Sequence, residues 1–216
     1  MPDAGDLDAA PAVTGILLAG GRSRRMGHDK ASMILDGQSL LQRTATALAT
    51  VVDEIVVVRA PGAALPAVDA PCPVVHAEDP VEGEGPLVGI ARGLEVARAP
   101  LALVVGVDMP FLQTALLRLL IERLRADLEG GARWVLPIAD GRAQPLCSAM
   151  VCDALGTLRA RIEAGDRAPM AVADILHATR LAEADWRAAD PEGLSFLDVD
   201  TPEDVAAALA QLGRGT

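Results

Sequence analysis

Residues Val13–Lys30 read VTGILLAGGRSRRMGHDK, an apolar run that passes directly into glycines and basic side chains. The apolar part, Val13–Ala19, has the length and composition of a buried β-strand. The adjacent glycines that follow allow backbone conformations closed to other residues. In α/β proteins, ligands bind where the carboxyl ends of parallel strands meet the loops that follow them. The stretch therefore predicts a strand that opens into a binding loop.

Similar apolar runs return along the chain and alternate with segments of helical spacing, a pattern typical of βαβ units. The other predicted strands are Glu54–Val58, Pro73–Ala77, Leu101–Val107, Trp134–Ile138 and Pro145–Val151, the last broken by polar residues as at a sheet edge. The predicted helices between them are Ser39–Val52, with Ser39 as its cap, Leu87–Ala97 and Thr114–Leu128. The sequence thus predicts a single-domain, three-layer α/β/α Rossmann-like sandwich with a mostly parallel sheet.

The last third of the chain does not continue the alternation of strands and helices. Helices are expected over Asp153–Ala164 and Met170–Ala178, and a short strand over Phe196–Val199. A closing helix should begin after Thr201-Pro202, because Thr is a good N-cap and Pro suits the first helical position. Residues 1–12 are acidic and rich in Ala and Pro and are predicted to be a disordered tail, which leaves 13–216 as one domain.

Composition excludes several classes of function. The 216-residue chain carries a net charge of −11, which disfavours nucleic acid and anionic membrane partners. Its three cysteines lack the paired C-x-x-C spacing of a zinc site. The longest apolar run, Leu101–Val107, is far shorter than the roughly 20 residues of a membrane span, and no secretory signal is recognisable. We therefore expect a soluble, cytoplasmic protein.

The basic loop has the chemistry of a polyphosphate cradle. Gly20 and Gly21 bring backbone N–H groups close to an anion, while Arg25 and Lys30 add positive charge. The spacing fits neither the Walker A loop nor the G-x-G-x-x-G dinucleotide fingerprint. The alternative interpretation is a glycine-rich turn with an exposed basic patch. The position of the loop after a strand favours the cradle.

Carboxylates follow other predicted strands at the same sheet edge. Asp108 closes the run Leu101–Val107, and one aspartate beside a triphosphate is a donor set that Mg²⁺ prefers. Asp79 follows another strand and either holds a nucleotide or occupies a solvated turn before Pro80. Asp200 either joins Asp108 at the metal or belongs to the turn that caps the closing helix.

With these residues in place, the chain resembles the molybdenum cofactor guanylyltransferases, within the nucleotide-triphosphate transferases of the nucleotide-diphospho-sugar transferase fold. The resemblance extends from about Thr14 to about Leu212 and is most specific at Leu18–Lys30, which is similar to the LAGG-x-S-x-RMG-x-DK signature. Further matching motifs are Glu78-Asp79, Gly85-Pro86-Leu87-Val88-Gly89, Asp108-Met109-Pro110, Gln144-Pro145-Leu146 and Thr201-Pro202-Glu203-Asp204.

The resemblance implies roles for individual residues. It assigns GTP binding to Leu18, Ala19, Gly20 and Lys30, nucleotide contact to Asp79, and both GTP and Mg²⁺ to Asp108. Arg59 stands where a family asparagine contacts GTP, so that role is not carried over. The sequence Asp198-Val199-Asp200 replaces asparagines found in many guanylyltransferases, and Asp108-Met109-Pro110 is also common in the related cytidylyltransferase.

The implied reaction is transfer of GMP from GTP to the phosphate of molybdopterin, with release of pyrophosphate. Two other hypotheses remain: CTP or another phosphorylated acceptor as substrate, and a non-catalytic GTP-binding regulator. Arg159, Arg161 and Arg167 are unspecific candidate ligands for an anionic acceptor. Transient contact with molybdoenzymes or their chaperones is the protein interaction that the resemblance would imply.

Overall fold

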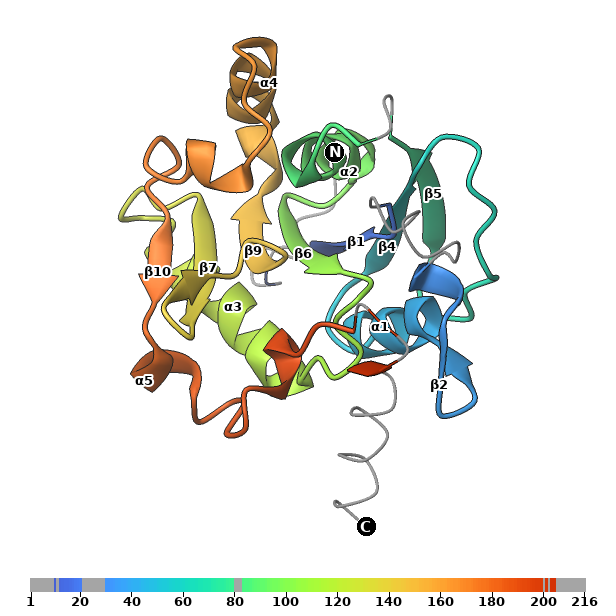
Figure 1. Ribbon diagram of the computed structural model, residues 1–216. Helices are drawn as coiled ribbons and strands as arrows, with labels where there is room; N and C mark the ends of the chain where they lie inside the picture. Colours follow the sequence, from blue (N-terminus) through green and yellow to red (C-terminus); the bar gives the residue numbers. More distant parts are fainter. Residues whose placement is uncertain are drawn as a thin grey trace, which may run out of the picture.

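The computed structural model describes residues 10, 12–20, 30–79, 83–199, 201, 203 and 204. Its centre is a sheet with eight described strands, in the order β10-β7-β9-β6-β1-β4-β5 with β8 paired to β7 (Figure 1). The strands are β1 (Val13–Leu18), β4 (Glu54–Arg59), β5 (Val74–Glu78), β6 (Leu101–Gly106), β7 (Trp134–Ala139), β8 (Arg142–Ala143), β9 (Cys147–Val151) and β10 (Thr179–Leu181).

Helices cover both faces of this sheet. They are α1 (Leu40–Leu48), α2 (Pro86–Val96), α3 (Thr114–Asp127), α4 (Leu155–Glu163) and the short α5 (Glu183–Trp186). Figure 1 shows α2 on one side of the sheet and α1 with α3 on the other. The Ser39 hydroxyl accepts a hydrogen bond from the Gln42 N–H and caps α1, as predicted. The three-layer α/β/α fold is confirmed.

The sheet is parallel except at β9 and at the short β8, which pairs antiparallel with β7. Parallel pairs are β1–β4, β1–β6, β4–β5 and β7–β10, whereas β9 runs antiparallel to both β6 and β7. The prediction that this strand lies at a sheet edge was wrong, because β9 is interior and its residues are buried. Its polar residue Ser148 tolerates burial because the hydroxyl donates to the Pro145 carbonyl at 2.8 Å.

Two other predicted elements took a different form. Within Met170–Ala178 the chain forms only the 3-10 helix η4 (Pro169–Val172) and turns, which end at His177 with a positive φ of 47°. The expected strand Phe196–Val199 is replaced by the 3-10 helix η5 (Leu194–Phe196) and irregular chain. The buried Asp190 carboxylate accepts from the N–H groups of Leu194 and Ser195, which favours the helical turn over a strand.

Shorter elements complete the described chain. They are the 3-10 helices η2 (Lys30–Ser32) and η3 (Cys152–Ala154) and a hairpin of β2 (Ile34–Leu35) and β3 (Gln38–Ser39). Thr201 and Asp204 exchange hydrogen bonds, each side chain accepting from the other's N–H, so the predicted cap is confirmed. No helix among the described residues is long and apolar enough to span a membrane.

A close helix–sheet contact fixes the position of α2 over β1. A Cβ added at Gly93 would lie 2.4 Å from Ile16 Cγ2, and Ile16 is fully buried. We expect Gly93→Ala to lower the free energy of unfolding by about 1–3 kcal/mol, because a packed core cannot accept the extra methyl without shifts. Urea unfolding followed by circular dichroism measures this change.

The matched control is Gly156→Ala in α4, where a Cβ would meet nothing within 4 Å. This variant should be neutral or more stable by up to about 1 kcal/mol, because alanine favours helices. Equal destabilisation by both substitutions would contradict the close-contact explanation.

Candidate active site

The predicted ligand residues gather at one edge of the sheet, where β1, β4, β5 and β6 end. Leu18 at the end of β1 is in register with Val58 and with Gly106, and Arg59 is in register with Glu78. The chain moves from β1 toward β4 and β5, then returns to form β6 on the other side of β1. Such a switch in direction opens the crevice in which α/β proteins bind ligands.

Lys30 and Asp108 form the central charged pair of this edge. The Lys30 Nζ donates to the Asp108 Oδ2 at 3.0 Å, although the two residues are 78 positions apart along the chain. Their side chains are 22% and 25% exposed, so both remain accessible to a ligand. Lys30 lies in η2, directly after the basic loop, and it is the sole lysine of the sequence. The structure thus brings together two of the predicted catalytic residues.

The conformation of Asp108 depends on a neighbouring glycine that the sequence interpretation did not single out. A Cβ at Gly106 would lie 2.5 Å from the Asp108 Oδ1, so the carboxylate occupies space that any other residue would fill. The same glycine donates its N–H to the Leu146 carbonyl at 3.0 Å. A glycine two positions before an aspartate at a strand end was the available signal.

The reversed direction of β9 matters here. The turn Gln144–Leu146 precedes β9, and because β9 is antiparallel to β6 this turn lies beside the end of β6. The motif Gln144-Pro145-Leu146 therefore reaches the same edge as Asp108, and the Asp108 carbonyl in turn accepts from the Val199 N–H at 2.9 Å. Segments from the last third of the chain thus border the charged pair.

The start of the basic loop is held close to the end of β4. Leu18 and Ala19 are buried, and the Ala19 N–H donates to the Val58 carbonyl at 2.8 Å. A Cβ at Gly20 would lie 3.1 Å from the Ala60 nitrogen, so this glycine permits the approach of the two chains. Of the other predicted residues, Gly21, Arg25 and Asp200 lie outside the described residues.

Asp79 also lies at this edge, as predicted. Its N–H donates to the Arg59 carbonyl at 2.8 Å. A Cβ at Gly89 of α2 would lie 3.4 Å from Leu18 Cδ2 and 3.8 Å from the Asp79 Oδ2, so Gly89 lies between the β1 end and this carboxylate. The Arg59 guanidinium points to other partners, donating to the Ala63 carbonyl and pairing with Glu78 at 3.5 Å.

The donor chemistry fits a metal held jointly with a substrate. Among the described residues, no three His, Cys, Asp or Glu side chains gather as a preformed metal cage. Asp108 supplies one carboxylate, and Mg²⁺ commonly binds one or two carboxylates together with substrate phosphates. The residues present therefore fit a magnesium ion that arrives with a nucleotide.

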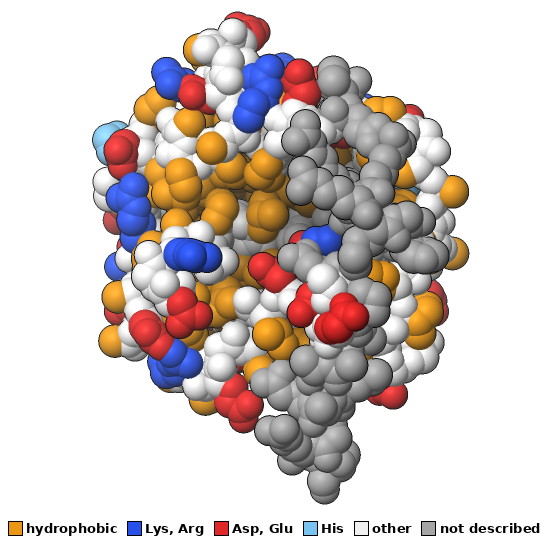
Figure 2. Space-filling model, in the orientation of Figure 1, with side chains coloured by type: hydrophobic (Ala, Val, Ile, Leu, Met, Phe, Trp, Pro, Cys, Tyr) orange, Lys and Arg blue, Asp and Glu red, His pale blue; other side chains and the backbone are white. Residues whose placement is uncertain are grey.

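The three arginines considered for an acceptor are engaged elsewhere. Arg159 pairs with Glu95 at 2.5 Å, Arg161 with Asp166 at 2.5 Å, and Arg167 with Glu84 at 3.3 Å. On the face shown in Figure 2, the side chains gathered over the region where β9 and η4 lie in Figure 1 are hydrophobic rather than basic.

Two cysteines, Cys147 in β9 and Cys152 directly after it, are unsuited to nucleophilic chemistry. Burial, followed by the charges of Asp190 and Asp198, raises the pKa of the Cys147 thiol to about 12. Burial also raises the pKa of Cys152 to about 12, with contributions from Asp153 and Glu54. Because the thiolate is the reactive form, both side chains remain neutral thiols near pH 7.

The chain shares its sequence with a known family over most of its length. The family described as MobA-like NTP transferase domain matches residues 15–185. The chain belongs to this family. A probable molybdenum cofactor guanylyltransferase from Chloroflexus aggregans is 35% identical over 207 residues, which cover 93% of this chain and 95% of the relative. This member of the MobA-like family is therefore a nucleotidyltransferase.

Solved structures share the fold of this MobA-like domain. Molybdopterin-guanine dinucleotide biosynthesis protein A from Archaeoglobus fulgidus matches with a TM-score of 0.72 and 22% identity, covering 93% of this chain and 99% of that one. A Mycobacterium tuberculosis protein solved in complex with manganese matches with a TM-score of 0.56 and 20% identity, covering 92% and 98%. At these identities the likeness establishes the fold.

Proposed function

We propose that this enzyme transfers GMP from GTP to the phosphate of molybdopterin and releases pyrophosphate. The observation that carries the proposal is the Lys30–Asp108 pair, placed beside the end of β1 where the basic loop begins. The relative from Chloroflexus aggregans, named a probable molybdenum cofactor guanylyltransferase, supports the choice of substrates.

In this reaction an oxygen of the acceptor phosphate forms a bond to the α-phosphorus of GTP. The bond from that phosphorus to the β-phosphate oxygen breaks, and its electrons leave with pyrophosphate. No protein base is required, because a phosphate nucleophile is already ionised near neutral pH. Catalysis then depends on positioning and on neutralisation of charge, as in other phosphoryl transfers.

The residues at the sheet edge have separate tasks in this proposal. Lys30 binds the β- and γ-phosphates and stabilises the leaving pyrophosphate, with Arg25 as a second cation. Leu18, Ala19, Gly20 and Gly21 bring backbone groups to the nucleotide, and Asp79 contacts it. Asp108 would hold Mg²⁺, with Asp200 as a second candidate ligand. Bound there, Mg²⁺ would neutralise phosphate charge and lower the barrier to displacement.

The Lys30–Asp108 ion pair also suits a site in which both side chains must exchange each other for a nucleotide and its cation. Without a nucleotide, each charge neutralises the other at 3.0 Å. A triphosphate and its cation provide new counter-charges for both side chains, so the pair can separate without leaving an uncompensated charge. A permanently buried ion pair would resist this exchange, because separation would leave a desolvated charge.

Isothermal titration with GTP, CTP, ATP and UTP in the presence of Mg²⁺ tests the nucleotide first. We expect GTP to bind at least about tenfold more tightly than the others, a difference of about 1.4 kcal/mol. Preference for CTP would move the enzyme to the cytidylyltransferase reaction. Binding to none of the four would contradict the proposed nucleotide site.

The acceptor is tested by pyrophosphate release. GTP and molybdopterin together should release pyrophosphate, and GTP alone should not. Selective GTP binding without release in the presence of molybdopterin would point to another phosphorylated acceptor or to a GTP-binding regulator. Affinity capture with molybdoenzymes or their chaperones would test the proposed transient contact.

A further inference from the structure

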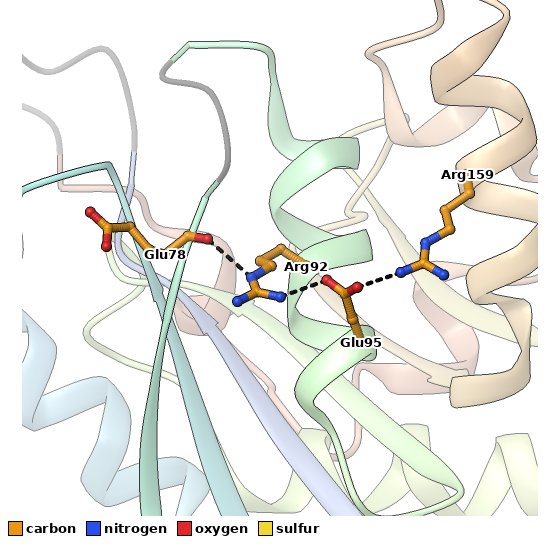
Figure 3. A network of polar contacts seen from close by, with 4 residues as sticks. All are labelled: Glu78, Arg92, Glu95 and Arg159. Atoms are coloured by element: carbon orange, nitrogen blue, oxygen red, sulfur yellow. Dashed lines mark hydrogen bonds and ion pairs between the residues drawn. The ribbon is translucent and has the colours of Figure 1, made fainter.

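Helix α2 contacts the end of β5 through two residues one turn apart, Gly89 and Arg92. The Arg92 Nε donates to the carbonyl oxygen of Glu78 at 3.0 Å (Figure 3). Gly89 lies near the next residue, since a Cβ there would be 3.8 Å from the Asp79 Oδ2, an ordinary contact distance. One helix face therefore contacts the peptide that precedes Asp79 and lies near the Asp79 carboxylate.

The Glu78–Asp79 peptide is also held from the opposite side. The Asp79 N–H donates to the Arg59 carbonyl at 2.8 Å. The Glu78 carboxylate accepts from the Gly62 N–H at 2.5 Å and pairs with Arg59 at 3.5 Å. Arg92 thus supplies support from the helix side to a peptide that also contacts β4 and the turn after it.

Arg92 itself is oriented by a chain of charges that Figure 3 shows in full. Its Nη1 donates to the Glu95 Oε2 at 2.6 Å, and the Glu95 Oε1 accepts from the Arg159 Nη2 of α4 at 2.5 Å. The hydrogen bond from Arg92 is the largest influence on Glu95 and lowers the pKa of this carboxyl, so Glu95 is ionised near neutral pH.

These ion pairs contribute little to stability. The side chains of Arg92, Glu95 and Arg159 are 33%, 42% and 53% exposed, and exposed pairs typically contribute about 0–1 kcal/mol. We therefore interpret these ion pairs as fixing the orientation of the Arg92 guanidinium rather than as stabilising the fold. A guanidinium bonded to a carboxylate through one nitrogen presents its remaining N–H groups in a fixed plane, which directs Nε at the Glu78 carbonyl.

We propose that Arg92 is a positioning residue that holds Asp79 in its nucleotide-binding orientation. It acts through the Glu78 carbonyl, while Glu95 fixes the guanidinium and Arg159 steadies Glu95. The inference rests on the proposed function, since it assumes that Asp79 contacts the nucleotide. Without Arg92 the Glu78–Asp79 peptide loses its hydrogen bond to α2, and the backbone that orients the Asp79 carboxylate is less firmly placed.

A double-mutant cycle on Arg92 and Asp79 tests this coupling. The variants are Arg92→Met, Asp79→Asn and their combination, each titrated with the nucleotide that the wild type binds best. Arg92→Met should weaken binding about tenfold, and Asp79→Asn should weaken it at least as much. The combined variant should bind no more than about twofold more weakly than Asp79→Asn alone. Arg92 acts through the Asp79 carboxylate, so its removal has little further effect once that carboxylate is absent.

Arg159→Met is the matched control, because it removes the same charge from the same network but leaves the bond to Glu78. It should change nucleotide affinity less than about threefold, which also separates positioning from long-range attraction of the triphosphate. Thermal unfolding of Arg92→Met and Arg159→Met should be similar, since both lose one exposed ion pair.

Three results would overturn the assignment while leaving the proposed function intact: unchanged affinity in Arg92→Met, additive losses in the combined variant, or an equal loss in Arg159→Met. A wild type that binds none of the four nucleotides would instead overturn the proposed function, and this inference with it. The wild-type titration therefore tells the two failures apart.

Discussion

Asp108→Asn is expected to lower the turnover number for pyrophosphate release by about two to three orders of magnitude, a typical loss when an electrostatic stabiliser of the transition state is removed. Asparagine has nearly the same shape but carries no charge, so it neither neutralises Lys30 nor holds a cation as well as the carboxylate. The measurement is steady-state turnover at saturating GTP and Mg²⁺.

The fold should survive this substitution. The Asp108 side chain is one-quarter exposed, and loss of a partly exposed ion pair costs at most about 1 kcal/mol. Asp174→Asn is the matched control: its side chain is 92% exposed and pairs with Arg180, so turnover should be unchanged. Turnover within about threefold of the wild type in Asp108→Asn would rule out the assigned role of this carboxylate.

Lys30→Met is expected to weaken GTP binding and to reduce turnover by about two orders of magnitude or more, because charge-assisted bonds to phosphate are among the strong polar contacts. Lys30→Arg should not restore activity. The planar guanidinium is larger than the compact ammonium that lies 3.0 Å from Asp108, and its bonding geometry differs. Titration with GTP and turnover measurements separate the two effects.

The control for Lys30 is Arg180→Met on β10, which removes one positive charge at the far end of the sheet order. Any loss shared by the two variants reflects the overall charge of an acidic protein. A loss confined to Lys30→Met reflects the site. If Lys30→Arg retained full activity, a general positive charge would suffice and the specific role of the amine would be wrong.

Local sequence patterns predicted the architecture well. Val13–Ala19 and Leu101–Val107 are continuous apolar runs, and both are strands buried on the two faces of the sheet. Their buried position follows from composition, because parallel strands covered by helices lack polar alternation. The sequence also predicted that Lys30 and Asp108 lie at the same edge of the sheet. Asp108 comes directly after such a strand, and Lys30 comes directly after the loop that follows another.

The errors lie where side-chain hydrogen bonds and packing, rather than the pattern of polar and apolar residues, decide the conformation. Ser148 suggested an edge strand, but its hydroxyl bonds to the local Pro145 carbonyl and β9 is interior. Phe196 suggested a strand, but Asp190 caps a helical turn there and Trp186 packs edge-on against the Phe196 ring. The spacing of Gly106 and Asp108 is visible in the sequence, but the close approach of the carboxylate to Gly106 depends on side-chain orientation, which the pattern does not give.

The division into a tail at 1–12 and a domain at 13–216 stays a prediction, as do the roles of all the site residues, of which Gly21, Arg25 and Asp200 lie outside the described residues. Their part in the site rests on chemistry and on the family resemblance. The structure shows only that six of these residues lie at one edge of the sheet: Leu18, Ala19, Gly20, Lys30, Asp79 and Asp108.

Because Lys30 is the sole lysine of the sequence, its side chain can be labelled selectively. Eighteen arginines supply every other permanently basic side chain, and guanidinium groups do not react with amine-selective acylating reagents under mild conditions. Side-chain acylation of this protein therefore reports on one atom, the Lys30 Nζ. The mass of a single peptide then records whether the Lys30 amine is accessible or covered by a ligand, without a reporter group having to be engineered into the enzyme.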